Sequence, residues 1–279
     1  MKFLIWEVLL ESLKISGLVF LMLVAVDLIN VVAKGRIKEG IKGGVWRQYL
    51  IASFLGITPG CLGAFASVSL YVHGNLTLGA LVAGMVATAG DEEFVMLSLF
   101  PWQAVLLFAF LFVCGVLCGW ATDRIAVRLN IRPRESCSLE TYHPEEESRG
   151  HYLREHVWGH ILREHVWRVF LWTSGALLVV HLGLHSWDLT GFVREHTVWM
   201  LLLSGLVGII PESGPHLIFV MLYAAGLVPF SVLFTSSFVQ DGHGLLPLLS
   251  YSVKDAALTK GFILAFGLIA GGLLYGLGW

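Results

Sequence analysis

The chain has 279 residues, of which 56% are hydrophobic and only 14% are charged, and its formal net charge is −2. Soluble domains carry roughly 25% charged residues, so this composition excludes an ordinary soluble protein and predicts an integral membrane protein. The four cysteines lack the spacing of an extracellular disulfide framework, and no nucleotide-binding glycine motif is present. We therefore expect no disulfide system, no nucleotide-driven pumping, no bound cofactor and no nucleic-acid partner.

Eight apolar segments are candidates for membrane-spanning helices, which need about 20 residues each. They run near 8–33, 49–73, 76–100, 103–122, 168–186, 197–225, 228–250 and 261–279. Two stretches rich in Lys and Arg, 34–47 and 123–168, are predicted to be cytoplasmic by the positive-inside rule. An even number of crossings must separate two cytoplasmic stretches, but three segments lie between them. One of these segments is therefore predicted to be broken or re-entrant.

The breaks are predicted where Pro and Gly interrupt apolar sequence, because Pro removes an amide donor and Gly loosens the backbone. ITPGCLG (57–63) interrupts the second segment, and TAGDEEF (88–94) interrupts the third. An offset of 152 residues aligns GITPGCLGAFASVSLYVHG (56–74) with GIIPESGPHLIFVMLYAAG (208–226), with Pro, Tyr and Gly in register. We interpret this as two homologous halves.

The two basic stretches, if both are cytoplasmic, give the halves opposite orientations, which is the inverted-repeat plan of secondary transporters. The fold class predicted is thus an all-α polytopic membrane protein with about 10 transmembrane segments, some of them broken or re-entrant. The expected organisation is a first repeat at 1–122, a cytoplasmic loop rich in His, Arg and Glu at 123–167, and a second repeat at 168–279.

Three consecutive acids, Asp91, Glu92 and Glu93, follow Gly90 within the third apolar segment. A charge at the centre of a membrane helix costs about 2.5–3.5 kcal/mol on insertion scales, so such residues usually face a cavity and are compensated by a cation. The alternative is a loop at the membrane surface, where acids are tolerated. We predict these three carboxylates to be metal ligands.

The corresponding stretch of the second half is QDGHG (240–244), and the 152-residue offset puts Asp91 opposite His243. Gln240, Asp241 and His243 can turn to one side only in an extended or broken stretch, which the flanking glycines favour. The alternative is a surface turn between two short helices. These three residues are also predicted metal ligands.

IIPESGPHL (209–217) contributes Glu212 and His216, spaced i, i+4, which would share one face of a helix. Ser213 adds a hydroxyl. The aligned stretch of the first half offers Thr58 and Cys61, which are assigned with Ser213 to accessory or proton-relay roles. The alternative is a Pro-kinked packing element with Glu212 at a helix start.

The loop contains a tandem duplication, GHYLREHVW (150–158) followed by GHILREHVW (159–167). His156 and His160 are spaced i, i+4, which suits a divalent ion and predicts a regulatory or buffering metal site. The zinc-protease spacings are absent. A polar amphipathic helix produced by local duplication is the alternative.

Four motifs resemble the ten-helix heavy-metal exporter family, whose members are described as manganese transporters or arsenic efflux proteins. They are TPGCLGAF (58–65), GDEEFVMLSLFP (90–101), IPESGPHLIFV (210–220) and SSFVQDGHGLLPLLSYS (236–252). The resemblance covers nearly the whole chain except the His-rich loop, and it implies five crossings per half.

Oxygen and nitrogen ligands suit Mn²⁺ and its neighbours better than Cu⁺, and protons can use the same carboxylates. We therefore predict a secondary-active, proton-coupled exporter of a divalent transition metal, with Mn²⁺ favoured and the ion site between the repeats. The alternatives are an arsenic or organoarsenic permease and an intramembrane metal-dependent enzyme. The expected location is a bacterial inner membrane with the His-rich loop in the cytoplasm. The sequence leaves the oligomeric state open.

Overall fold

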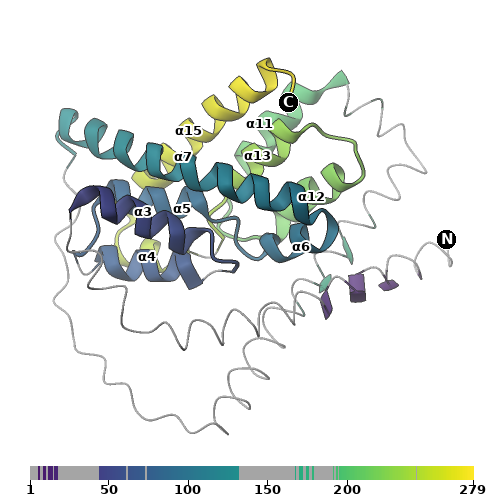
Figure 1. Ribbon diagram of the computed structural model, residues 1–279, viewed down its shortest axis with the longest axis horizontal. Helices are drawn as coiled ribbons and strands as arrows, with labels where there is room; N and C mark the ends of the chain where they lie inside the picture. The colour runs from purple at the N-terminus through teal and green to yellow at the C-terminus, as the bar shows by residue number, and fades with distance from the viewer. Residues whose placement is uncertain are drawn as a thin grey trace, which may run out of the picture.

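The computed structural model describes residues 44–131 except 61 and 73, residues 195–279 except 243, and isolated positions within 6–17 and 167–193. Every regular element among the described residues is helical, as the composition predicts (Figure 1). Residues 18–43 and 132–166, which include most of the predicted first segment and most of the predicted loop, lie outside the description.

The first group of helices covers the predicted second to fourth apolar segments. It comprises α3 (Val45–Gly56), α4 (Leu62–Val72), α5 (Leu78–Ala87), α6 (Glu92–Leu99) and α7 (Pro101–Arg128). The side chain of Thr77 accepts a hydrogen bond from the amide of Ala80 and thereby caps the start of α5. Pro101 begins α7, where the missing amide donor would have no intrahelical partner. The predicted interruptions at 57–63 and 88–94 both separate helices.

The second group, within residues 195–279, repeats this order. It comprises α11 (Thr197–Val207), the short 3₁₀ turn η2 (Gly214–His216), α12 (Leu217–Ala224), α13 (Phe230–Val239), α14 (Leu245–Tyr251) and α15 (Val253–Gly276). The hydroxyl of Ser252 accepts from the amide of Asp255 at the start of α15. The apolar segment predicted at 261–279 therefore begins too late, because the cap at Ser252 starts the helix at Val253.

The two groups have corresponding elements in the 152-residue register. α5 and α13 correspond at both ends, and α3 with α11 and α7 with α15 correspond at their first residues. The glycines that end α4 and α12 have left-handed backbones, with a φ of 71° at Gly74 and 69° at Gly226. The same main-chain bond closes both turns, at 2.8 Å from Gly74 N to Tyr71 O and 2.9 Å from Gly226 N to Tyr223 O. The offset of 152 residues that aligns the two sequences therefore also aligns the backbone conformations of the two groups.

Each group packs mainly on itself, and two short helices cross over. α5 packs on α3 and α7, while α13 packs on α11 and α15. α14 of the second group packs on α4 of the first, and α6 of the first packs on α12 of the second (Figure 1). Because α4 corresponds to α12 and α6 to α14, this is a reciprocal exchange between the halves.

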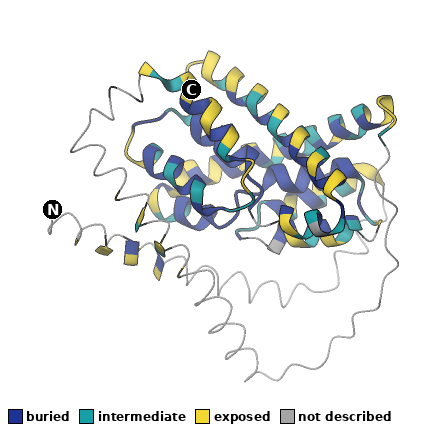
Figure 2. Cartoon of the chain, turned by 180° about the vertical axis from the view of Figure 1, so that it is seen from behind, coloured by how far each residue is buried: buried dark blue, intermediate teal, exposed yellow. Residues whose placement is uncertain are grey.

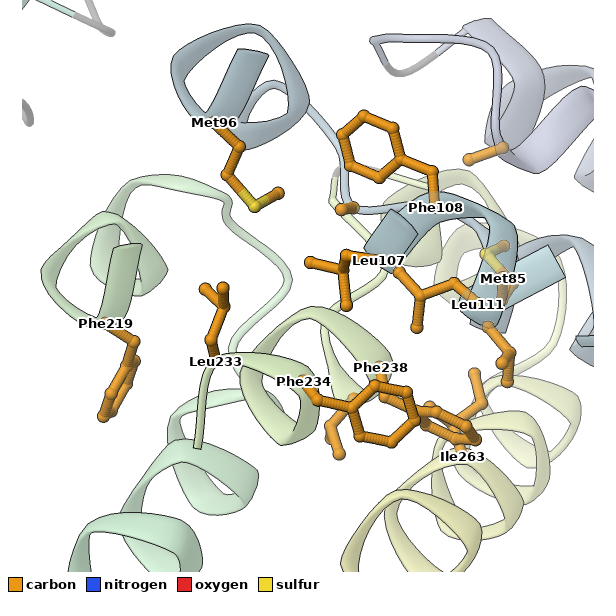
Figure 3. Close-up of a cluster of buried hydrophobic side chains, with 14 of the residues drawn as sticks. Met85, Met96, Leu107, Phe108, Leu111, Phe219, Leu233, Phe234, Phe238 and Ile263 are labelled. Atoms are coloured by element: carbon orange, nitrogen blue, oxygen red, sulfur yellow. The ribbon is translucent and has the colours of Figure 1, made fainter. Parts of the chain in front are cut away.

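The apolar core draws side chains from both groups. Figure 3 shows Leu107 and Leu111 of α7 directed toward Phe234 and Phe238 of α13. All four side chains are buried, and the two Phe rings lie 5.5 Å apart between centroids. The two groups are therefore joined by close packing of apolar side chains and not only by the chain between them.

Two helices within the described residues, α7 and α15, are long and apolar enough to cross a membrane. Only 33% and 28% of the residues in their most apolar windows are buried inside the protein. Figure 2 shows exposed positions along the outward faces of the helices, and on α7 these include Trp102, Leu106 and Phe110. A contiguous apolar surface of this kind is rare on a soluble monomer and is suited to lipid.

Candidate ion site

Two broken stretches have the same conformation in the two halves. The residue after α5, Thr88, is extended, and so is Gln240 after α13. Two positions later the backbone is left-handed, with a φ of 61° at Gly90 and 55° at Gly242, a conformation that glycine adopts without strain. In each break the side chain of the first residue accepts a hydrogen bond from the glycine amide, over 3.2 Å at Thr88 Oγ1 and 3.0 Å at Gln240 Oε1.

The breaks of both halves meet. A methyl group on Gly90 would lie 2.7 Å from Ser213 Oγ and 3.3 Å from both Gln240 Oε1 and Gly242 Cα. These contacts bring together three stretches: 88–91 before α6, 240–244 before α14, and 211–213 before η2. Gly244 would carry a methyl group 2.7 Å from the Cβ of Ala64, which lies in the first turn of α4 just after the interruption at 57–63. The stretches 57–63, 88–94, 209–217 and 240–244 therefore lie around one junction between the halves.

The three acids of the first half are buried at this junction. Asp91 is 6% exposed, Glu92 1% and Glu93 0%, which contradicts the alternative of a surface loop. Glu93 Oε1 accepts a hydrogen bond of 2.7 Å from the amide of Ala89 and so holds the break closed. Neither carboxylate oxygen of Glu92 has a hydrogen-bond partner among the described residues. A buried carboxylate without a hydrogen-bond donor is costly. Of the three acids, Glu92 is therefore the one whose burial a bound cation would stabilise most.

Asp241 in the second half is fully buried, which contradicts the alternative of a surface turn. Its Oδ2 lies 2.9 Å from the ammonium nitrogen of Lys260 on α15, and the side chain of Lys260 is 8% exposed. The same ammonium donates over 2.9 Å to the carbonyl of Val239, the last residue of α13. The sequence does not predict this buried ion pair, because Lys260 precedes the last predicted apolar segment, 261–279. The sequence feature that could have indicated this pair is the position of Lys260 on the buried face of α15, four residues after the buried Ala256.

The pairing of Glu212 with His216 on one helical face is wrong. Glu212 lies in irregular chain before η2 and is partly exposed, since Pro211 and Pro215 prevent a continuous helix. His216 is fully buried, and its Nδ1 lies 3.2 Å from Ser236 Oγ of α13. Its Nε2 has no hydrogen-bond partner among the described residues, and the same holds for the hydroxyl of Ser213.

The remaining predicted site residues divide into two kinds. The hydroxyl of Thr58 donates to the carbonyl of Leu55 and closes the end of α3, which is a structural use. His243, Cys61, His156 and His160 lie outside the described residues. In the part of the chain that the structure describes, no three His, Cys, Asp or Glu side chains are grouped so as to hold a metal ion by themselves.

These features define a polytopic helical membrane protein with ionisable side chains buried at paired helix breaks, the arrangement found in secondary transporters. Residues 9–182 and 165–275 match the family described as "Putative, 10TM heavy-metal exporter", and the chain belongs to this family. The resemblance seen in the sequence is thereby confirmed. No curated protein and no solved structure matches the chain.

Proposed function

We propose that the chain exports a divalent transition-metal ion, with Mn²⁺ favoured, by proton-coupled secondary transport. The observation that carries this proposal is the burial of Glu92 and Asp241 where helix breaks from the two halves meet. Intramembrane carboxylates at broken helices often mark ion pathways in membrane proteins, because burying them is costly.

The ligands proposed for the ion are mostly oxygen atoms. Besides the carboxylates they include the amide oxygen of Gln240, which is already aimed into the junction, and main-chain carbonyls that the breaks leave outside helices. His243, in the same break, is proposed as a nitrogen ligand. Oxygen-rich sets with one imidazole suit Mn²⁺ better than softer ions.

Transport is proposed to alternate access to this junction. The matching helix bounds support two repeats, and the two basic stretches at 34–47 and 123–168 support opposite orientations in the membrane. Rocking of one repeat against the other would then expose the junction to each side in turn. Protons and the metal compete for the same carboxylates, so proton entry would release the ion outside and drive its export.

The direct test is Mn²⁺ flux into liposomes that contain the purified full chain and carry a pH gradient. Glu92→Gln should lower the flux at least tenfold, because a neutral amide cannot balance the charge of the ion. Glu195→Gln, the same change at an exposed acid, is the matched control and should transport normally. Normal flux in both Glu92→Gln and Asp241→Asn would remove the proposed site.

One observation favours a second candidate, an arsenic permease. The hydroxyl of Ser213 and the amide nitrogen of Gln240 are buried at the junction without partners among the described residues, and such groups could bind a neutral arsenic hydroxide. The same liposomes distinguish the two substrates. Arsenite flux without Mn²⁺ flux would favour the permease, and its loss in Cys61→Ser would then indicate a thiol route.

A further inference from the structure

Lys260 occupies a position with the chemistry of a cation site. Its ammonium nitrogen lies 2.9 Å from both the carboxylate of Asp241 and the carbonyl of Val239. Val239 ends α13, so its carbonyl belongs to the negative end of a helix dipole. A carboxylate beside the carbonyl end of a broken helix is a ligand pair that transporters use for small cations. Here the chain's own ammonium group fills that place.

A purely structural role for this ion pair is not required by the break. In the 152-residue register Asp241 corresponds to Ala89 and Lys260 to Phe108, so the first half has no such pair. Yet the break in the first half has the same conformation, with Thr88 extended, Gly90 left-handed, and the Gly90 amide hydrogen-bonded to the side chain of Thr88. The geometry of the break is thus reached without an ion pair, which leaves the pair in the second half to be explained by something else.

Charge balance during transport explains it. In metal–proton exchange, Asp241 passes through a state in which neither the metal nor a proton is bound, and a bare carboxylate buried as completely as Asp241 is costly in that state. An ammonium group that approaches when the metal leaves would offset the charge of the carboxylate until a proton or another ion binds. Lys260 is suited to this because its charge is carried on a flexible four-carbon side chain, unlike a fixed main-chain dipole.

We propose that Lys260 is a built-in cation that competes with the transported ion for Asp241. Binding of the metal displaces the ammonium from the carboxylate, and release of the metal lets it return. Metal affinity is lowered by this competition, which keeps the ion from being trapped. The proposal rests on the proposed function, since it needs a cation that binds at Asp241.

The test uses Mn²⁺ as the probe and the purified full chain in detergent. Lys260→Met removes the charge at similar volume, so Mn²⁺ binding measured by equilibrium dialysis should become at least tenfold tighter than in the unaltered chain. Lys260→Arg keeps the charge and should bind Mn²⁺ no more tightly. Lys254→Met, the same substitution at an exposed lysine of α15, is the matched control and should leave the affinity unchanged.

A structural ion pair and a competing cation predict opposite results. If the pair only supports the fold, Lys260→Met binds Mn²⁺ as weakly as the unaltered chain or more weakly, and the proposal is overturned. If Lys260→Met is recovered only as aggregate, Mn²⁺ present throughout purification should restore a monodisperse protein, because the metal takes the place of the ammonium; failure to do so also overturns it.

The outcomes separate this proposal from the proposed function. If the unaltered chain shows no Mn²⁺ binding that Asp241→Asn weakens, metal transport through this site is refuted. If Asp241→Asn weakens Mn²⁺ binding but Lys260→Met does not strengthen it, only the proposed competition is refuted.

Discussion

Replacement of Gly90 by alanine tests whether the breaks meet as the structure shows. Two costs add at this position. The left-handed backbone, with a φ of 61°, costs an alanine about 1–2 kcal/mol. The new methyl group would lie 2.7 Å from Ser213 Oγ and 3.3 Å from Gly242 Cα, and overpacking of this kind costs about 1–3 kcal/mol. Gly90→Ala should therefore destabilise the protein by about 2–5 kcal/mol.

The matched control is Gly226→Ala. Gly226 has a similar φ of 69°, but a methyl group there would have no atom within 4 Å, so only the backbone cost of about 1–2 kcal/mol applies. Thermal unfolding of the detergent-purified variants measures both, at about 2–4 °C of melting temperature per kcal/mol for a chain of this order of size. Ser213→Ala should restore part of the loss in Gly90→Ala, because it removes the nearest crowding atom. Equal melting temperatures for Gly90→Ala and Gly226→Ala, with no rescue by Ser213→Ala, would refute the convergence of the breaks.

Two further predictions concern single hydrogen bonds and use the same unfolding assay. Glu93→Ala leaves the buried amide of Ala89 without its acceptor and should cost about 1–3 kcal/mol, whereas Glu93→Gln keeps an acceptor oxygen and should cost clearly less; equal losses would show that the carboxylate does not hold the break. Tyr71→Phe removes the 3.0 Å bond from the Tyr71 hydroxyl to Asp255, which joins α4 to α15, and should cost about 1.5–3 kcal/mol. Its repeat counterpart Tyr223→Phe, where the ring packs on Phe100, should change little, and the reverse order would contradict the role of this bond between the halves.

The helix breaks could be predicted because their causes are local. Pro59 has no amide donor wherever it lies, and Gly90 and Gly242 are the residues that accept a left-handed backbone most readily. The correspondence of helix bounds in the 152-residue register could be anticipated for a related reason. Pro, Tyr and Gly recur in one register at positions where the backbone turns, and chance rarely reproduces them in apolar sequence.

The pairing of Asp241 with Lys260 could not be predicted in the same way. The apolar pattern placed the start of the last segment after Lys260, because Lys254, Asp255 and Lys260 together resemble a membrane boundary. Only the packing of α15 on α13 shows that Lys260 faces the interior. The prediction for Glu212 fails for the opposite reason, because i, i+4 spacing indicates a shared face only within a continuous helix, which Pro211 and Pro215 interrupt.

The crossed packing of α6 on α12 and of α14 on α4 has a consequence for how the protein is made. The ribosome delivers the first half before the second, so α6 enters the membrane before the helix that will cover it exists. Until α12 has been inserted, α6 lacks a helix against which it packs in the complete structure. The crossed packing between the halves therefore forms only after the second half has been delivered.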